Sequence, residues 1–187
     1  MKKIVILASG NGTNAQAIIN HFSKKKSVEI SLVLSNKPKA YVLERAQKNN
    51  IPAMSFNNFA FAKAGKVEFL LKAENPDLIV LAGFLWKIPE SLVKLFPKKI
   101  INIHPALLPN YGGKGMYGMN VHRAIIENKE EKSGITIHYV NEHYDEGAII
   151  EQFTCPVYQN DTADDLAARI HELEHLHFPM VIEELLD

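Results

Sequence analysis

Cysteine, excess charge and long hydrophobic runs are scarce in this sequence. The single cysteine, Cys155, excludes an internal disulfide and fits a reducing compartment, for which the cytoplasm is the default. The 21 Lys and Arg residues are balanced by 21 Asp and Glu residues. The chain therefore lacks the bulk positive field on which non-specific binding to nucleic acid or to an acidic membrane depends, and any anion site must be local.

Hydrophobic runs are too short for a signal peptide or a membrane span. The apolar run at 4–8 follows Met1, Lys2 and Lys3 but is only five residues long, short of the core that a signal peptide needs. The longest uncharged apolar stretch, 78–86, reaches about half the length of a membrane-spanning helix. We expect neither a membrane nor a nucleic acid as a partner.

The composition is that of an ordinary globular protein, with 47% hydrophobic and 22% charged residues, and predicts a single domain covering 1–187. Short runs rich in Ile and Val alternate with segments of helical period, which is typical of an α/β fold with a doubly wound, mostly parallel sheet and helices on both faces. We expect it to end in an antiparallel strand pair and a C-terminal helix, which Thr162 and Asp165 open as a capping box. The expected strands are 4–8, 30–34, 52–55, 78–81, 99–103, 134–140 and 148–156, and the expected helices before the last are 15–22, 41–47, 59–73, 89–96 and 119–128.

A glycine-containing segment, 9–15, follows the first expected strand and opens the first helix. Its glycines, Gly12 among them, let the backbone approach a ligand, the first N–H groups of the helix point at an anion, and Thr13 and Asn14 add short polar side chains. The spacing also fits the dinucleotide fingerprint, but a nicotinamide enzyme needs an acidic residue after the second strand, and 35–37 read Ser-Asn-Lys. We expect a phosphate site, with a purely structural turn as the alternative.

Asn102 and His104 give the sharpest local signal. Alternate residues of a strand share a face, so these two side chains point the same way while Ile101 and Ile103 point into the opposite layer. Open parallel sheets bind ligands at the carboxyl ends of their strands, which predicts that the amide and the imidazole meet a substrate. The alternative is a hydrogen-bonded histidine in a turn fixed by Pro105.

Asp145 lies in the connection 141–147, where Asn, Glu and Asp usually only make turns. On local evidence that interpretation is preferred. Asp145 becomes important only if the fold brings it to His104, where a carboxylate would favour the protonated imidazole.

His171 and His175 lie one helical turn apart with Glu172 between them, a pattern typical of zinc proteases. A third ligand is missing, because the later carboxylates Glu183 and Glu184 lie on the same predicted helix, so we expect no metal. The predicted buried stripe of this helix leaves both histidines on a polar face and consists of Leu166, Ile170, Leu173, Met180 and Val181.

Five segments, taken in order, resemble those of the folate-dependent formyltransferases, and the resemblance covers nearly the whole chain. They are Ser9–Asn14, Leu81–Phe84, Asn102–Pro109, His122–Ala124 and Asp145–Gly147. The Asn-x-His-Pro part is specific for formyl-transfer and formyl-hydrolysis relatives. Ser9–Asn14 narrows the resemblance to the glycinamide ribonucleotide branch and to a formyltetrahydrofolate hydrolase.

The resemblance implies roles for individual residues. The expected catalytic residues are Asn102 and His104, around the formyl carbon, and Asp145, which keeps the imidazole cationic. The expected contacts of the ribonucleotide are Gly12, Thr13, Asn14, His171 and Glu174. The expected contacts of the folate are Asn102, Asp145, Lys63 (or Lys66), the wall Leu85, Trp86, Lys87 and Ile88, and the loop Asn141, Glu142, His143 and Tyr144.

The activity that the resemblance implies is transfer of a formyl group from 10-formyltetrahydrofolate, as co-substrate, to the amine of 5-phosphoribosylglycinamide in purine (IMP) biosynthesis, without a metal. The enzyme would act on small molecules in the cytoplasm, as a monomer or homodimer. The nearest alternative is a formyltetrahydrofolate hydrolase with water as acceptor. Such relatives usually carry an N-terminal regulatory domain, and this sequence begins at its first expected strand.

Three further classes are disfavoured. A formyltransferase acting on initiator methionyl-tRNA would need a basic C-terminal domain for which 187 residues leave no room. A non-catalytic nucleotide-binding module would keep the glycine segment but would have no use for Asn102, His104 and Asp145 together. A redox enzyme of the Rossmann type is disfavoured by the residues after the second strand.

Overall fold

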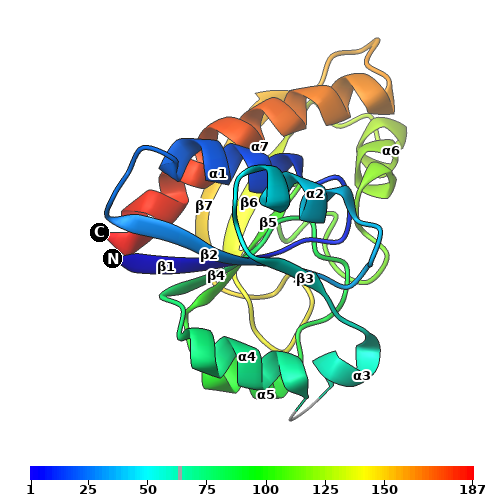
Figure 1. Cartoon of the computed structure of the whole chain (residues 1–187). Coiled ribbons are helices and arrows are strands. Elements are labelled where there is room, and N and C mark those ends of the chain that lie inside the picture. The colour runs from blue at the N-terminus through cyan, green and yellow to red at the C-terminus, as the bar shows by residue number, and fades with distance from the viewer. Residues whose placement is uncertain (63–64) are drawn as a thin grey trace.

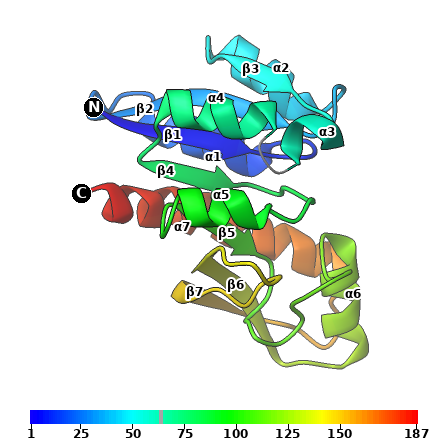
Figure 2. The ribbon, with the colours of Figure 1, turned by 90° about the horizontal axis from the view of Figure 1, so that it is seen from below.

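The sheet has the expected doubly wound topology. The computed structural model describes residues 1–62 and 65–187, and within them seven strands pair in the order β3-β2-β1-β4-β5-β6-β7 (Figures 1 and 2). The pairs among the first five strands are all parallel, whereas β6 is antiparallel to both of its neighbours, β5 and β7. The strands are β1 (Lys2–Leu7), β2 (Val28–Ser35), β3 (Ala53–Ser55), β4 (Leu78–Leu81), β5 (Ile100–His104), β6 (Lys132–Tyr139) and β7 (Ile149–Pro156).

Helices cover both faces of the sheet, as Figure 1 shows. The helices that pack on one face are α1 (Thr13–Phe22), α2 (Tyr41–Lys48), α6 (Met119–Glu127) and α7 (Ala163–Leu186), and those on the other are α3 (Asn58–Phe61), α4 (Lys66–Glu74) and α5 (Glu90–Leu95). The alternation of β1 supplies both layers, since Ile4 and Ile6 pack on the first face and Val5 and Leu7 on the second. Each of these side chains is at most 1% exposed, and burying one contributes roughly 1.5–3 kcal/mol.

The single helix predicted over 59–73 is wrong. The chain forms two helices there, α3 and α4, with Ala62 in extended conformation after the first and Gly65 in extended conformation before the second. Asn57 caps α3 by accepting a hydrogen bond from the backbone N–H of Ala60 at 2.9 Å. Glycine is a poor helix former, and the break lets Phe61 turn into the aromatic cluster beneath the sheet.

The capping box of α7 is confirmed, but its buried stripe was predicted only in part. Thr162 and Asp165 exchange the two expected hydrogen bonds. Met180 is 46% exposed, so its assignment to the core is wrong, and Leu173 is only partly buried. The buried positions instead recur every four residues and include Leu166, Ile170, Glu174, Phe178 and Ile182. A carboxylate therefore occupies the middle of an otherwise apolar stripe.

The topology places several loops at one edge of the sheet. The chain reverses its direction of progress between β1 and β4, and ligands of open α/β sheets bind at such a switch point. Ser9 ties the loops after these two strands together, because its N–H donates to Gly83 O at 3.0 Å and its Oγ accepts from Leu85 N at 2.9 Å. Both chain termini lie at the opposite end of the sheet (Figure 1).

No helix in the described part of the chain combines the length and the apolar character that crossing a bilayer requires.

Candidate functional site

A cleft of about 440 Å³ opens at this edge of the sheet. Its walls come from the loops after β1, β4 and β5, the glycine-rich segment 112–118, the turn between β6 and β7, and helices α6 and α7. Most residues predicted to act in catalysis or substrate binding line it. These are Gly12, Thr13, Asn14, Leu85, Asn102, His104, Tyr144, Asp145, His171 and Glu174.

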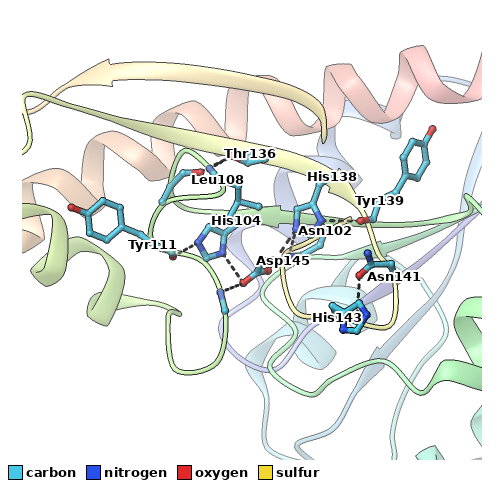
Figure 3. A network of polar contacts seen from close by, with 12 residues as sticks. Asn102, His104, Leu108, Tyr111, Thr136, His138, Tyr139, Asn141, His143 and Asp145 are labelled. Atoms are coloured by element: carbon cyan, nitrogen blue, oxygen red, sulfur yellow. Dashed lines mark hydrogen bonds and ion pairs between the residues drawn. The ribbon is translucent and has the colours of Figure 1, made fainter. Parts of the chain in front are cut away.

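The three predicted catalytic residues lie together, as Figure 3 shows. Asn102 and His104 share one face of β5, while Ile101 and Ile103 are buried in the opposite layer as predicted. The Nδ1 atom of His104 lies 3.7 Å from Oδ2 of Asp145. The backbone N–H of Gly113 donates to the same carboxylate oxygen at 2.9 Å. Asp145 is thus more than a turn residue, because it joins the glycine-rich segment to the histidine.

His138 is part of this cluster and was missed. It lies opposite Asn102 in the β5–β6 pairing and is 2% exposed. Its Nδ1 donates to the carbonyl of Tyr139 at 2.9 Å, since that oxygen can only accept. In the neutral ring Nε2 is then an acceptor, and Asn102 Nδ2 donates to it at 3.1 Å. Burial lowers the pKa of His138, which favours this neutral form.

The sequence did hold a signal for His138. Thr136 and His138 alternate with the fully buried Ile135 and Ile137, just as Asn102 and His104 alternate with isoleucines one strand earlier. Polar residues that alternate with fully buried apolar ones mark a face that meets something other than core. The rule that identified β5 would have identified β6.

Both ring nitrogens of His104 have partners in this structure. Nε2 donates to the carbonyl of Tyr111 at 2.8 Å, and Nδ1 faces Asp145. The alternative interpretation of His104, a hydrogen-bonded histidine in a turn, therefore describes part of its environment. Thr136 fixes that turn, since its Oγ1 accepts from Leu108 N at 3.0 Å and donates to Ala106 O at 2.7 Å.

The loop that carries Asp145 is shaped by close contact with β6. A Cβ at Gly147 would lie 1.6 Å from the carbonyl oxygen of Tyr139, so only glycine fits there. Asp145 itself has φ 56°, a left-handed conformation that aspartate tolerates better than most residues. Asn141 starts the turn by accepting a hydrogen bond from His143 N at 2.9 Å. The loop thereby folds back toward β5.

The glycine segment forms the start of α1 as predicted. Gly12 is the N-cap residue with φ 75°, and a Cβ there would lie 2.5 Å from Cγ2 of Val42. The N–H groups of the first turn have no acceptor within the helix and are available to an anion. The turn itself therefore requires glycine at position 12, as the structural alternative predicts. This requirement does not depend on whether the segment binds a phosphate.

The side chain of Asn14 contacts α7. Its Nδ2 donates to Oε2 of Glu174 at 2.9 Å, and its Oδ1 is buried without a partner among the described residues. Glu174 is 6% exposed, and burial raises the pKa of its carboxyl group. The signal in the sequence was a glutamate on the apolar stripe of α7.

His122 is a histidine that lines the cleft and for which the sequence indicated no role. It lies on α6 and is 3% exposed. Burial, together with the nearby His171 and His104, lowers the pKa of His122 to about 4. Its Nδ1 is buried and has no hydrogen-bond partner in the described part of the chain. The imidazole is therefore neutral at physiological pH.

The predicted folate contacts are only partly brought together. Leu85 is exposed and lines the cleft, whereas Trp86 packs against Phe56, Phe61 and Phe84 in the core below. Lys87 Nζ lies 5.7 Å from the ring centroid of Tyr144, which joins the predicted wall to the predicted loop. The remaining predicted contacts do not line the cleft: Ile88 is buried, Asn141 is half-buried, Glu142 and His143 are exposed, and Lys66 begins α4. Lys63 lies outside the described residues.

The zinc-protease pattern is split between two surfaces. His171 lines the cleft, while His175 lines a groove between α1 and α7. Their rings are nearly parallel with centroids 6.2 Å apart. Residues 1–62 and 65–187 contain no cluster of three or more His, Cys, Asp or Glu side chains arranged to hold a metal ion.

Comparison with known proteins gives a consistent family. The family model described as formyl transferase matches residues 2–182. Chloroplastic phosphoribosylglycinamide formyltransferase of Vigna unguiculata is 41% identical over 98% of this chain, which spans 61% of that relative's length. Phosphoribosylglycinamide formyltransferase of Bacillus subtilis is 37% identical over 100% of this chain and 95% of the relative. The crystal structure of glycinamide ribonucleotide transformylase 1 from Geobacillus kaustophilus superposes with a TM-score of 0.89 at 35% identity, covering 100% of both chains.

The lowered pKa of His122 predicts a pH-dependent stability. The unfolded chain binds a proton at this histidine near pH 6.5 and the folded chain only near pH 4, so stability is lost as the pH falls between these values. Between pH 7 and pH 5 this loss amounts to about 2 kcal/mol. Urea denaturation should show that His122→Leu loses about 2 kcal/mol less than wild type over this interval. Ile125→Val, which removes no titratable group from α6, should keep the wild-type loss, and an equal loss in all three proteins would contradict the assignment.

Proposed function

Since the chain belongs to the formyl transferase family, we propose that it transfers a formyl group from 10-formyltetrahydrofolate to the amine of 5-phosphoribosylglycinamide. The observation that carries the proposal is that one cleft is lined both by the start of α1, whose first N–H groups are available to an anion, and by the cluster of Asn102, His104 and Asp145. A phosphorylated amine lying along the cleft would place its phosphate and its nucleophile at these two parts of the cleft. The names of the relatives agree with this substrate.

The proposed reaction makes one bond and breaks one. The amine nitrogen bonds to the formyl carbon, the bond from that carbon to the folate nitrogen breaks, and the proton lost by the amine is balanced by one gained at the folate nitrogen. Negative charge grows on the formyl oxygen in between, and donors aimed at that oxygen stabilise the transition state. Asn102 has one Nδ2–H left after its bond to His138.

His104 supplies the second donor after an exchange of partners. Its Nε2–H is bound to the Tyr111 carbonyl, which is a neutral acceptor. Hydrogen bonds to a charged acceptor contribute roughly 1.5–3 kcal/mol against roughly 0.5–1.5 kcal/mol for neutral ones. The developing oxyanion therefore replaces the Tyr111 carbonyl as the acceptor of the hydrogen bond from His104. Tyr111, which precedes the glycine-rich segment, moves away from the ring in this step. On the other side of the ring, Oδ2 of Asp145 lies 3.7 Å from Nδ1 and holds the imidazole in place.

The folate is a co-substrate in this proposal, and it supplies the formyl group. Of the residues predicted as the folate wall and loop, Leu85 and Tyr144 line the same cleft as Asn102 and are best placed to contact the folate. No metal takes part. We propose the cytoplasm as the compartment and a monomer or homodimer as the assembly, while the relative from Vigna unguiculata is named chloroplastic.

The experiment that tests the proposal follows folate absorbance with purified protein, with and without glycinamide ribonucleotide. Consumption of 10-formyltetrahydrofolate that depends on the ribonucleotide, with formation of the formylated ribonucleotide, is the expected result. Equal consumption without it would identify a hydrolase, since the cluster around Asn102 could equally present water to the formyl carbon.

Loss of either donor should reduce turnover and spare the fold. We expect Asn102→Ala and His104→Ala each to lower kcat by about 100- to 1,000-fold, as loss of an oxyanion donor does. Stopped-assay kinetics and thermal unfolding measure the two properties separately. Asn128→Ala removes an exposed amide at the end of α6 and should leave turnover close to wild type. Near-normal turnover in either donor variant would remove that residue from the site.

The phosphate end can be tested at Gly10 better than at Gly12. A side chain at Gly12 collides with Val42, so its replacement damages the fold, whereas a Cβ at Gly10 meets nothing within 4 Å. Gly10 lines the cleft, and we expect Gly10→Val to raise KM for the ribonucleotide about tenfold or more, by blocking close approach of the phosphate, with little change for the folate. Steady-state kinetics with each substrate varied in turn decide this. Equal weakening of both substrates would mean that the segment is only a turn.

A further inference from the structure

His122 has a property that the fold does not require. Its ring is 3% exposed, and its Nδ1 has no hydrogen-bond partner among the residues that the structure describes. The large majority of buried side-chain polar atoms in folded proteins have a hydrogen-bond partner. An apolar side chain of similar size would fill the same place beside Val121 and Ile125 without this cost. The histidine therefore calls for an explanation outside the packing of α6.

The place of His122 in the cleft points to a ligand. Its ring lines the cleft together with Asn14, His171 and Glu174, and it is near enough to His171 and His104 for both to lower its pKa. Asn14 shows the same anomaly, because its Oδ1 is also buried without a partner in the described part of the chain. Two unpaired polar groups on one wall are explained together if a ligand satisfies them. A half-turn of the His122 ring about the Cβ–Cγ bond exchanges the positions of Nδ1 and Cδ2, and so changes which ring atoms a ligand in the cleft can contact.

The chemistry of this wall selects the kind of ligand group. Asn14 offers a carbonyl oxygen, Glu174 a carboxyl group, and a neutral imidazole offers one acceptor and one donor. None of these three groups is a fixed cation, so together they suit an uncharged polar group better than a phosphate or a carboxylate. Hydroxyl groups, which donate and accept, fit it well.

We propose that His122 binds hydroxyl groups of the sugar in the phosphorylated substrate and thereby helps to select a ribosyl substrate. The proposal rests on the proposed function, which places the sugar between the phosphate loop and the formyl-transfer cluster. His122 is a specificity-determining residue in this role. It is too weak a base at neutral pH to take the proton of the amine, because its pKa lies near 4.

Binding of two small probes tests the proposal without any turnover. Inorganic phosphate would contact only the phosphate end, whereas ribose 5-phosphate adds the sugar. The Kd of inorganic phosphate divided by the Kd of ribose 5-phosphate, both measured by calorimetry, therefore measures the sugar contact. We expect His122→Leu to reduce this ratio by about tenfold while Kd for inorganic phosphate stays unchanged. His122→Asn, which restores a short polar side chain, should recover part of the loss.

Stability separates a ligand contact from a packing role. The unfolding midpoint of His122→Leu without ligand should equal or exceed that of wild type at pH 7, because an unpaired polar group has been replaced by an apolar one. Ile125→Val serves as the matched control on the buried side of α6, and it should lower the midpoint without changing the ratio of the two Kd values.

Three outcomes would overturn the proposal. They are an unchanged ratio in His122→Leu, a loss that Ile125→Val reproduces, and a failure of His122→Asn to recover any of the loss. If His122→Leu fails to fold, ¹⁵N spectra of the wild-type imidazoles decide, since ribose 5-phosphate must shift the His122 resonances more than inorganic phosphate does, and equal shifts reject the contact. Formyl transfer by the wild-type protein is assayed separately, so a failure here and a failure of the proposed function are distinguishable.

Discussion

The antiparallel pairing of β5 with β6 is the constraint on which the site depends. It sets Asn102 opposite His138 and His104 opposite Thr136, so all four polar side chains share a face. A slip of one residue would turn them into the helix layer and expose isoleucines to the cleft. Ile101, Ile103, Ile135 and Ile137, all buried on the other face, hold the register against such a slip. The apolar layer therefore positions the polar one.

The same pairing explains why Asp145 needs an unusual loop. Since β6 runs against β5, its last residue, Tyr139, lies opposite Ile101, three residues before His104. A tight hairpin there would leave its carboxylate roughly 10 Å short of the histidine, given the rise of a strand. The chain instead folds back beneath Tyr139, which requires the glycine at 147 and the left-handed conformation of Asp145. The hydrogen bond from Gly113 then holds the carboxylate beside His104.

Much of this arrangement could be predicted from periodicity, and the remainder has identifiable physical causes. The alternation of polar and apolar residues identified Asn102 and His104, because the isoleucines beside them must face the core and so turn these side chains to the opposite face. The same rule, applied to the next strand, would have identified His138. Asp145 was found through family resemblance alone, since its position depends on a loop path that no local pattern encodes. The prediction of one helix over 59–73 was wrong because helical periodicity carries no information about tertiary contacts such as those of Phe61 with the aromatic cluster under the sheet. The assignment of Met180 to the core was wrong because the predicted stripe of α7 left out Glu174, the polar residue that continues the four-residue spacing of the buried positions.

Some residues of the site are required by the fold, and others are not. The two kinds differ in how strongly they indicate a function. Gly12 combines a positive φ with contact against Val42, so the turn alone demands glycine, and its presence is weak evidence for a phosphate. Glu174 on an apolar stripe and His122 with an unpaired nitrogen have the opposite status, because each costs the unliganded protein stability that an apolar residue would avoid. Selection for stability alone would remove them. Their presence together in one cleft is therefore stronger evidence for a bound ligand than the glycine motif at 9–15.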